Sequence, residues 1–170
     1  DGEFDVITAI GMIGASVKTG DDPIGLYGSG VKYAMAQAIR DGVPIKIADK
    51  GKVYTLTSKV KTFRGEDFDM VCLKSSTGKV HETGITSDFG KEDWKDRWYI
   101  FREFYSNMLD EKGSMDVVDT AQTSGGGVDV FLPYNRFQAC VDKVEDHFTE
   151  RDWKIRPGTG RCFKRGVYIG

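Results

Sequence analysis

Residues 29–60 have the sequence SGVKYAMAQAIRDGVPIKIADKGKVYTLTSKV, and this stretch decides the fold. Its first part, Ser29 to Asp41, is rich in Ala, Met and Gln, which favour a helix, and a glycine follows it as a stop signal. Val43 to Ala48 and Val53 to Val60 then predict two strands. Asp49-Lys50-Gly51 lies between them and indicates a hairpin turn. A helix followed directly by an antiparallel strand pair predicts an α+β domain.

The rest of the chain supports the same class. Further strands are predicted at Phe68–Leu73, which we expect to be central, and at Met115–Val118 and Val128–Leu132, which we expect to pair with each other. Apolar residues recur at helical spacing in three more stretches, Phe4–Ile13, Trp94–Leu109 and Phe137–Phe148. We therefore expect one α+β domain over residues 1–170, a two-layer sandwich of a mixed or antiparallel sheet with helices on one face.

Composition limits the function classes. The formal net charge is -2, which argues against a surface dedicated to coating nucleic acid. Cys72, Cys140 and Cys162 are widely spaced and belong to no CxxC motif, so we expect neither a disulfide framework nor a zinc site, and a cytoplasmic location. No apolar run is long enough to span a bilayer, so we expect no membrane association. The chain starts at Asp1 without Met, and we expect a fragment of a longer protein.

A glycine-rich motif lies at the start of the helix predicted over Ser29 to Asp41. The sequence Ile24-Gly-Leu-Tyr-Gly-Ser-Gly-Val-Lys32 places Gly25, Gly28, Ser29 and Gly30 at its start. Glycines let a ligand approach the backbone, and the amides and dipole of a helix N-terminus favour a phosphate. The alternative is a glycine-rich turn that only begins the helix. The motif lacks the Gly-Lys-Ser/Thr of a P-loop.

A second candidate site lies on the long helix predicted between Trp94 and Leu109. Glu103, Asn107 and Asp110 are spaced i, i+4 and i+7, so one helix face carries all three. An amide oxygen can bind magnesium, and a carboxylate can activate a water for attack on a phosphate. The alternative is a solvated face on which Arg102 and Lys112 are ion-pair partners.

Together the two motifs resemble those of the GHKL ATPases, the family of gyrase, heat-shock chaperones, histidine kinases and MutL. Glu-x-x-x-Asn-x-x-Asp after a basic residue resembles their N box, and Ile-Gly-x-x-Gly-x-Gly resembles their second glycine box. Gly14-Ala-Ser-Val-Lys18 resembles the lid of the MORC and chaperone branches. The motif order is circularly permuted, an order that we expect in uncharacterised bacteriophage and bacterial proteins.

The resemblance implies a Bergerat-like fold that holds ATP and Mg²⁺ between helices and sheet. It implies a role for each motif residue: Gly25, Gly28, Ser29 and Gly30 at the phosphates, Lys18 reaching over them, Asn107 on magnesium, Glu103 activating water and Asp110 lining the pocket. The family's Asp-x-Gly-x-Gly box, which reads adenine, is absent; Asn135 could replace it, or the box could follow Gly170. Two functions therefore remain open. One is magnesium-dependent ATP binding with slow hydrolysis; the other is binding of a partner protein by a catalytically degenerate scaffold.

Overall fold

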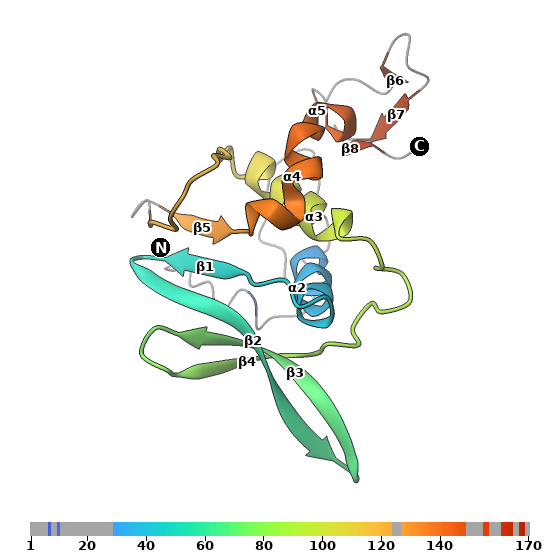
Figure 1. Cartoon of the computed structure of the whole chain (residues 1–170). Helices are drawn as coiled ribbons and strands as arrows, with labels where there is room; N and C mark the ends of the chain where they lie inside the picture. The colour runs from blue at the N-terminus through green and yellow to red at the C-terminus, as the bar shows by residue number, and fades with distance from the viewer. Residues whose placement is uncertain are drawn as a thin grey trace.

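The computed structural model describes residues 29–123 and 127–148, together with Ile7, Ile10 and the backbone of three short strands near the C-terminus. In this part the chain forms an α+β fold with a five-stranded sheet (Figure 1). The strand order is β4-β3-β2-β1-β5, and every neighbouring pair is antiparallel. The predicted fold class is confirmed, with the antiparallel form of the sheet.

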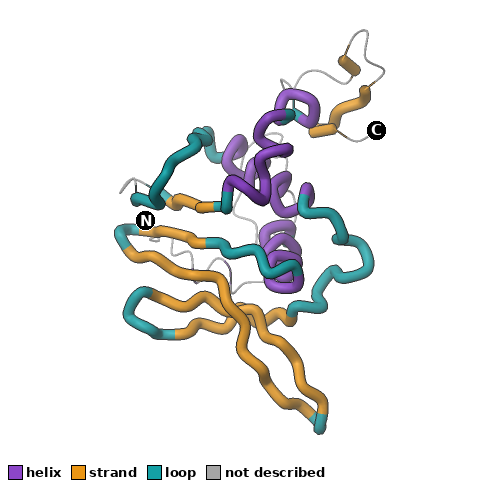
Figure 2. The backbone as a smooth tube through the Cα atoms, viewed as in Figure 1, coloured by secondary structure: helices purple, strands orange, loops and turns teal. Residues whose placement is uncertain are grey.

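The elements of the main body follow the chain in a simple order. The strands are β1 (Lys46–Asp49), β2 (Lys52–Phe63), β3 (Glu66–Ser75), β4 (Val80–Thr86) and β5 (Val128–Phe131). The helices are α2 (Gly30–Arg40), α3 (Trp98–Asp110), α4 (Tyr134–Asp142) and α5 (Val144–His147). Three short strands, β6 (Ile155–Arg156), β7 (Arg161–Lys164) and β8 (Val167–Tyr168), form a separate antiparallel sheet (Figure 2).

Helix α2 and the hairpin after it form as their local sequence predicts. The turn between β1 and β2 consists of Lys50 and Gly51, both with positive φ (49° and 76°). Positive φ at both central residues is the geometry whose twist matches the flanking strands. Asp49 pairs with Lys52 across this turn, which sets the register of the hairpin. The turn at Arg64 and Gly65, with φ of 53° and 85°, joins β2 to β3 in the same way.

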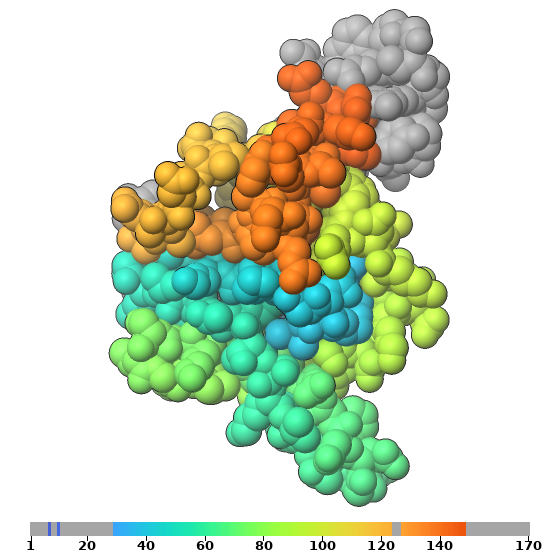
Figure 3. Space-filling view, in the orientation of Figure 1, coloured from blue at the N-terminus to red at the C-terminus, as the bar shows by residue number. Residues whose placement is uncertain are grey.

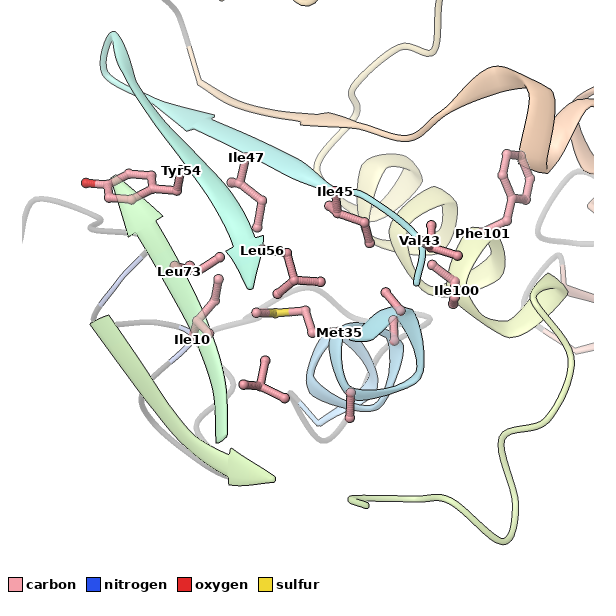
Figure 4. Packing of buried hydrophobic residues seen from close by; sticks show 14 of the residues in the cluster. Ile10, Met35, Val43, Ile45, Ile47, Tyr54, Leu56, Leu73, Ile100 and Phe101 are labelled. Carbon is pink, nitrogen blue, oxygen red and sulfur yellow. The ribbon is translucent and has the colours of Figure 1, made fainter. Parts of the chain in front are cut away.

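The core lies between the sheet and α2, with α3 packed on α2. On β2 the buried residues Tyr54 and Leu56 are two positions apart, and Leu56 shares a sheet face with its cross-strand partner Leu73. Met35 of α2 is fully buried and lies beside these two residues in Figure 4. Val43 and Ile100 join α3 to the same cluster. The sheet thus supports α2, and α2 supports α3.

Two helix predictions need correction at their ends. The helix predicted from Trp94 begins at Trp98; just before it, the Asp96 carboxylate accepts a bond from the Trp98 amide at 2.9 Å, which forms a local turn ahead of the N-cap residue Arg97. The helix predicted over Phe137–Phe148 is two helices, α4 and α5, separated by Lys143 with φ −118°. The amphipathic stripe continues across this break, so apolar spacing alone did not reveal it.

One strand prediction was wrong, and one strand was missed. Met115–Val118 is not a strand; these residues are exposed, and β5 pairs with β1 instead. β-Branched residues favour a strand only where a sheet face buries them. Strand β4 was missed because Gly84, with φ 77°, and an irregularity opposite residues 70–72 interrupt its alternation. The helix predicted over Phe4–Ile13 lies outside the described residues except for Ile7 and Ile10, which are helical.

The connection between β4 and α3 is tied to the end of α2. The Arg40 guanidinium donates to the carbonyl oxygens of Ser87, Phe89 (3.1 Å) and Trp94 (3.1 Å). Tyr33 stacks on Phe89 and Trp94, with ring centroids 4.3 and 5.2 Å apart. These contacts determine where α3 starts relative to α2.

We expect Arg40→Ala to lower the free energy of unfolding by about 2 kcal/mol, because three carbonyls lose a charged donor. Urea denaturation followed by circular dichroism measures the change. Arg136→Ala is the matched control, since Arg136 is exposed in the first turn of α4. If both variants unfold at the wild-type midpoint, Arg40 does not hold the connection.

Candidate functional site

The two sequence motifs meet where α2 begins. A Cβ placed on Gly30 would overlap the Glu103 Oε2 atom and lie 2.7 Å from its Cδ atom. Glycine is therefore the residue type that lets the first turn of α2 approach this carboxylate. The Glu103 side chain is 17% exposed. The first residue of one motif helix and the acid of the other, far apart in the sequence, thus form one site.

The helix packing places Glu103 at an electrostatically positive position. The first amides of an α-helix have no partner within the helix, and its dipole is positive at that end. The Ser29 carbonyl accepts from the amides of Lys32 (3.0 Å) and Tyr33 (3.1 Å), so α2 is regular from its first turn. The Glu103 carboxylate therefore occupies the position at the start of α2 that an anionic ligand would otherwise take.

Arg102 holds the other oxygen of the Glu103 carboxylate. Its Nη2 and Nε atoms donate to Glu103 Oε1 at 2.7 and 3.1 Å. The Arg102 guanidinium carbon lies 5.4 Å from the ring centroid of Trp94 and 4.9 Å from that of Tyr99. Cation–π contacts with two rings fix the guanidinium and thereby orient the carboxylate. The ion pair between Arg102 and Glu103 is one part of the predicted alternative, a solvated face with Arg102 and Lys112 as ion-pair partners, but the Glu103 side chain is not freely solvated.

Asn107 and Asp110 follow Glu103 on the same helix, as predicted. The Asn107 Nδ2 atom donates to the Glu103 carbonyl at 2.7 Å, four residues earlier. This bond commits the amide nitrogen to the backbone, so a metal ligand from Asn107 would have to be Oδ1. Asp110 is the last residue of α3 and is half-buried.

The other predicted site residues are not all placed. Ser29 is half-buried and directly precedes α2. Lys18, Gly25 and Gly28 lie outside the described residues, as does the predicted lid segment that contains Lys18. Asn135 is exposed in the first turn of α4, and no hydrogen bond or ion pair among the described residues joins it to Gly30 or Glu103.

Sequence reasoning missed Trp94 and Tyr99 as supports of Arg102, and it missed Lys32. Lys32 lies in the first turn of α2 and is 1% exposed. Burial lowers the pKa of its ammonium group, because desolvation disfavours the charged form. Lys32 could have been noted from the sequence, because it lies directly after the glycine-rich motif at the start of the predicted helix. The aromatic pair carried no comparable signal, because most aromatic residues in this region belong to the core.

A metal ion at this site would take most of its coordinating oxygens from a bound nucleotide and water rather than from protein side chains. Among residues 29–123 and 127–148, no three His, Cys, Asp or Glu side chains cluster closely enough to bind a metal ion. Magnesium characteristically takes one or two protein oxygens and completes its shell with phosphates and water. Asn107 Oδ1 fits that requirement as a single protein ligand.

Comparison with protein-family models, with curated proteins and with solved structures finds no match to this chain. In the described part of the chain, no helix is long and apolar enough to cross a membrane.

Proposed function

We propose that the chain binds a purine nucleoside triphosphate with Mg²⁺ at the start of α2 and hydrolyses it slowly. The contact between Gly30 and Glu103 is the observation that supports this function. It joins a helix N-terminus, which suits phosphate, to a carboxylate, which suits proton abstraction from water. The motif resemblance to GHKL ATPases supports the same proposal, because these two motifs flank the triphosphate in that family.

Each residue would have a defined task. The first amides of α2 would face the phosphates, and Asn107 Oδ1 would bind the magnesium ion. Glu103 would accept a proton from a water molecule while that water attacks the γ-phosphorus. The bond from the γ-phosphorus to the bridging oxygen would break, releasing nucleoside diphosphate and phosphate. Arg102 would supply positive charge beside the transferring group, where it stabilises the transition state.

A second candidate function is a scaffold without turnover that binds a partner protein. One observation favours it: the Glu103 carboxylate is already bonded to the Arg102 guanidinium at 2.7 Å, so an attacking water would have to compete with that contact. The missing Asp-x-Gly-x-Gly box points the same way, since that box reads adenine in the family that the motifs resemble. A nucleotide-binding measurement distinguishes the two functions less clearly than a turnover measurement, because only the first function includes hydrolysis.

Calorimetric titration with ATP, ADP and GTP, each with and without Mg²⁺, tests the proposal directly. We expect saturable binding of the triphosphates that weakens when magnesium is omitted, and little preference between ATP and GTP because the adenine-reading box is absent. Circular dichroism on the same sample shows whether the protein is folded. A flat titration against every nucleotide with folded protein would show that the proposal is wrong.

A further inference from the structure

The Glu103 carboxylate contacts two parts of the chain that favour an anion. Its Oε1 atom accepts hydrogen bonds from the Arg102 Nη2 and Nε atoms at 2.7 and 3.1 Å. Its Oε2 atom lies against Gly30, in the space that a Cβ there would fill. Gly30 is the first residue of α2, where the helix dipole is positive. One carboxylate oxygen therefore lies beside a guanidinium and the other beside a helix N-terminus.

A phosphate group at this place would use the same two partners. Guanidinium groups bind phosphate with paired hydrogen bonds, and helix N-termini bind it through their first amides. A phosphate also carries several charged oxygens on one atom, as the carboxylate carries two. The Glu103 side chain is thus an anion of the chain itself in the position of an anionic ligand.

The Arg102 guanidinium is also held by contacts that do not involve Glu103. It lies 4.9 Å from the ring centroid of Tyr99 and 5.4 Å from that of Trp94. Trp94 belongs to the connection before α3, and Tyr33 of α2 stacks on it at 5.2 Å. In the space-filling view this connection lies against one side of α2 (Figure 3). The guanidinium therefore keeps these ring contacts when the carboxylate leaves.

Both members of the ion pair can be reached from the solvent. The Arg102 side chain is 28% exposed and the Glu103 side chain is 17% exposed. The Glu103 carboxylate is at the end of a flexible side chain, so it can turn away from α2 without a backbone shift. A mostly buried charge that loses its partner is costly, so the Arg102 guanidinium favours the exchange of one anion for another.

We propose that Glu103 is an autoinhibitory side chain, and that the γ-phosphate of a nucleoside triphosphate displaces it from Arg102. This inference rests on the proposed function, because it assumes that the nucleotide binds at the start of α2. No covalent bond changes in this step: Arg102 exchanges one anion for another, and Glu103 turns away from α2. The released carboxylate is then free to accept a proton from the attacking water, so the exchange makes hydrolysis depend on the γ-phosphate.

A carboxyl-to-amide substitution tests the exchange by calorimetric titration with Mg-ATP. Glu103→Gln keeps the size of the side chain but removes the charge that competes for Arg102. We expect its affinity for Mg-ATP to rise about tenfold or more, since hydrogen bonds to charged groups are the strong ones. A general base without this contact would leave the affinity unchanged. Mg-ADP lacks the γ-phosphate, so its affinity should rise much less.

Exposed residues with the same charges provide matched controls. Glu92→Gln removes the same charge from a side chain that is 88% exposed, and it should leave the affinity for Mg-ATP unchanged. Arg102→Gln removes the group that receives the γ-phosphate and should weaken Mg-ATP binding about tenfold or more. Arg97→Gln removes the same charge from the exposed residue before α3 and should have no effect. Far-UV circular dichroism shows that each variant is folded.

Inorganic tripolyphosphate separates this inference from the proposed function, because it has a terminal phosphate but no nucleoside. We expect Glu103→Gln to bind it about tenfold or more tightly than the wild type does. Tighter binding of tripolyphosphate by Glu103→Gln, with no binding of Mg-ATP by any variant, supports the autoinhibitory contact and overturns the nucleotide function. No binding of either anion by folded protein overturns both.

Other outcomes overturn the exchange and leave the proposed function standing. Equal affinities of the wild type and Glu103→Gln for Mg-ATP would show that the carboxylate does not compete with the ligand. An equal gain in Glu92→Gln would show that only the net charge matters. Wild-type affinity in Arg102→Gln would show that Arg102 does not receive a phosphate, and equal gains for Mg-ATP and Mg-ADP would overturn its assignment to the γ-phosphate.

Discussion

Gly30→Val is expected to abolish magnesium–nucleotide binding while the chain stays folded. The new side chain would occupy the space of the Glu103 carboxylate, whose Cδ lies 2.7 Å from the position of a Cβ. The Glu103 carboxylate is at the distal end of a flexible side chain, so it can move away without a backbone shift. The displaced carboxylate and the added methyl groups would then block the approach of a phosphate to the first turn of α2. Calorimetric titration with Mg-ATP measures the loss.

Gly127→Val is the matched control for this variant. A Cβ on Gly127 would meet nothing within 4 Å, and Gly127 lies next to β5 rather than in α2. We expect this variant to bind nucleotide like the wild type. Wild-type affinity in Gly30→Val, with the same far-UV spectrum, would contradict a phosphate site at the start of α2.

Glu103→Ala is expected to lower turnover by about a hundredfold or more, which is the usual contribution of a general base. Nucleotide affinity should survive, because a base acts mainly in the transition state. Glu103→Gln keeps the shape of the side chain and should lose turnover as completely, which separates basicity from packing. Phosphate release under saturating Mg-ATP, combined with calorimetry, measures the two quantities separately.

Asn107→Ala should behave differently from the Glu103 variants. Removing a metal ligand should weaken binding in the presence of Mg²⁺ and have little effect in its absence. Gln138→Ala removes a side-chain amide from an exposed position on α4 and is the matched control. If the wild type binds nucleotide but releases no phosphate above a buffer blank, the proposed hydrolysis is wrong, and Glu103→Ala should then change nothing.

Secondary-structure elements that depend on local interactions could be predicted from the sequence. Helix α2 was predictable because alanine-rich segments favour helices in any context, and its end was marked by a glycine with φ 60°. The hairpin at Lys50 and Gly51 was predictable because two residues with positive φ specify both turn and register. Helix periodicity likewise placed Glu103 and Asn107 on one face before any contact was known.

The contacts between these elements could be seen only in the tertiary structure. Gly30 and Glu103 approach because α3 packs on α2, and the position of α3 depends on the Arg40 contacts with the connection from β4. No local pattern encodes such a crossing point, since it results from side chains distant in sequence filling one core. For the same reason Met115–Val118 stayed out of the sheet: a strand forms where a neighbour pairs with it and a face buries it, and neither condition is a property of the segment.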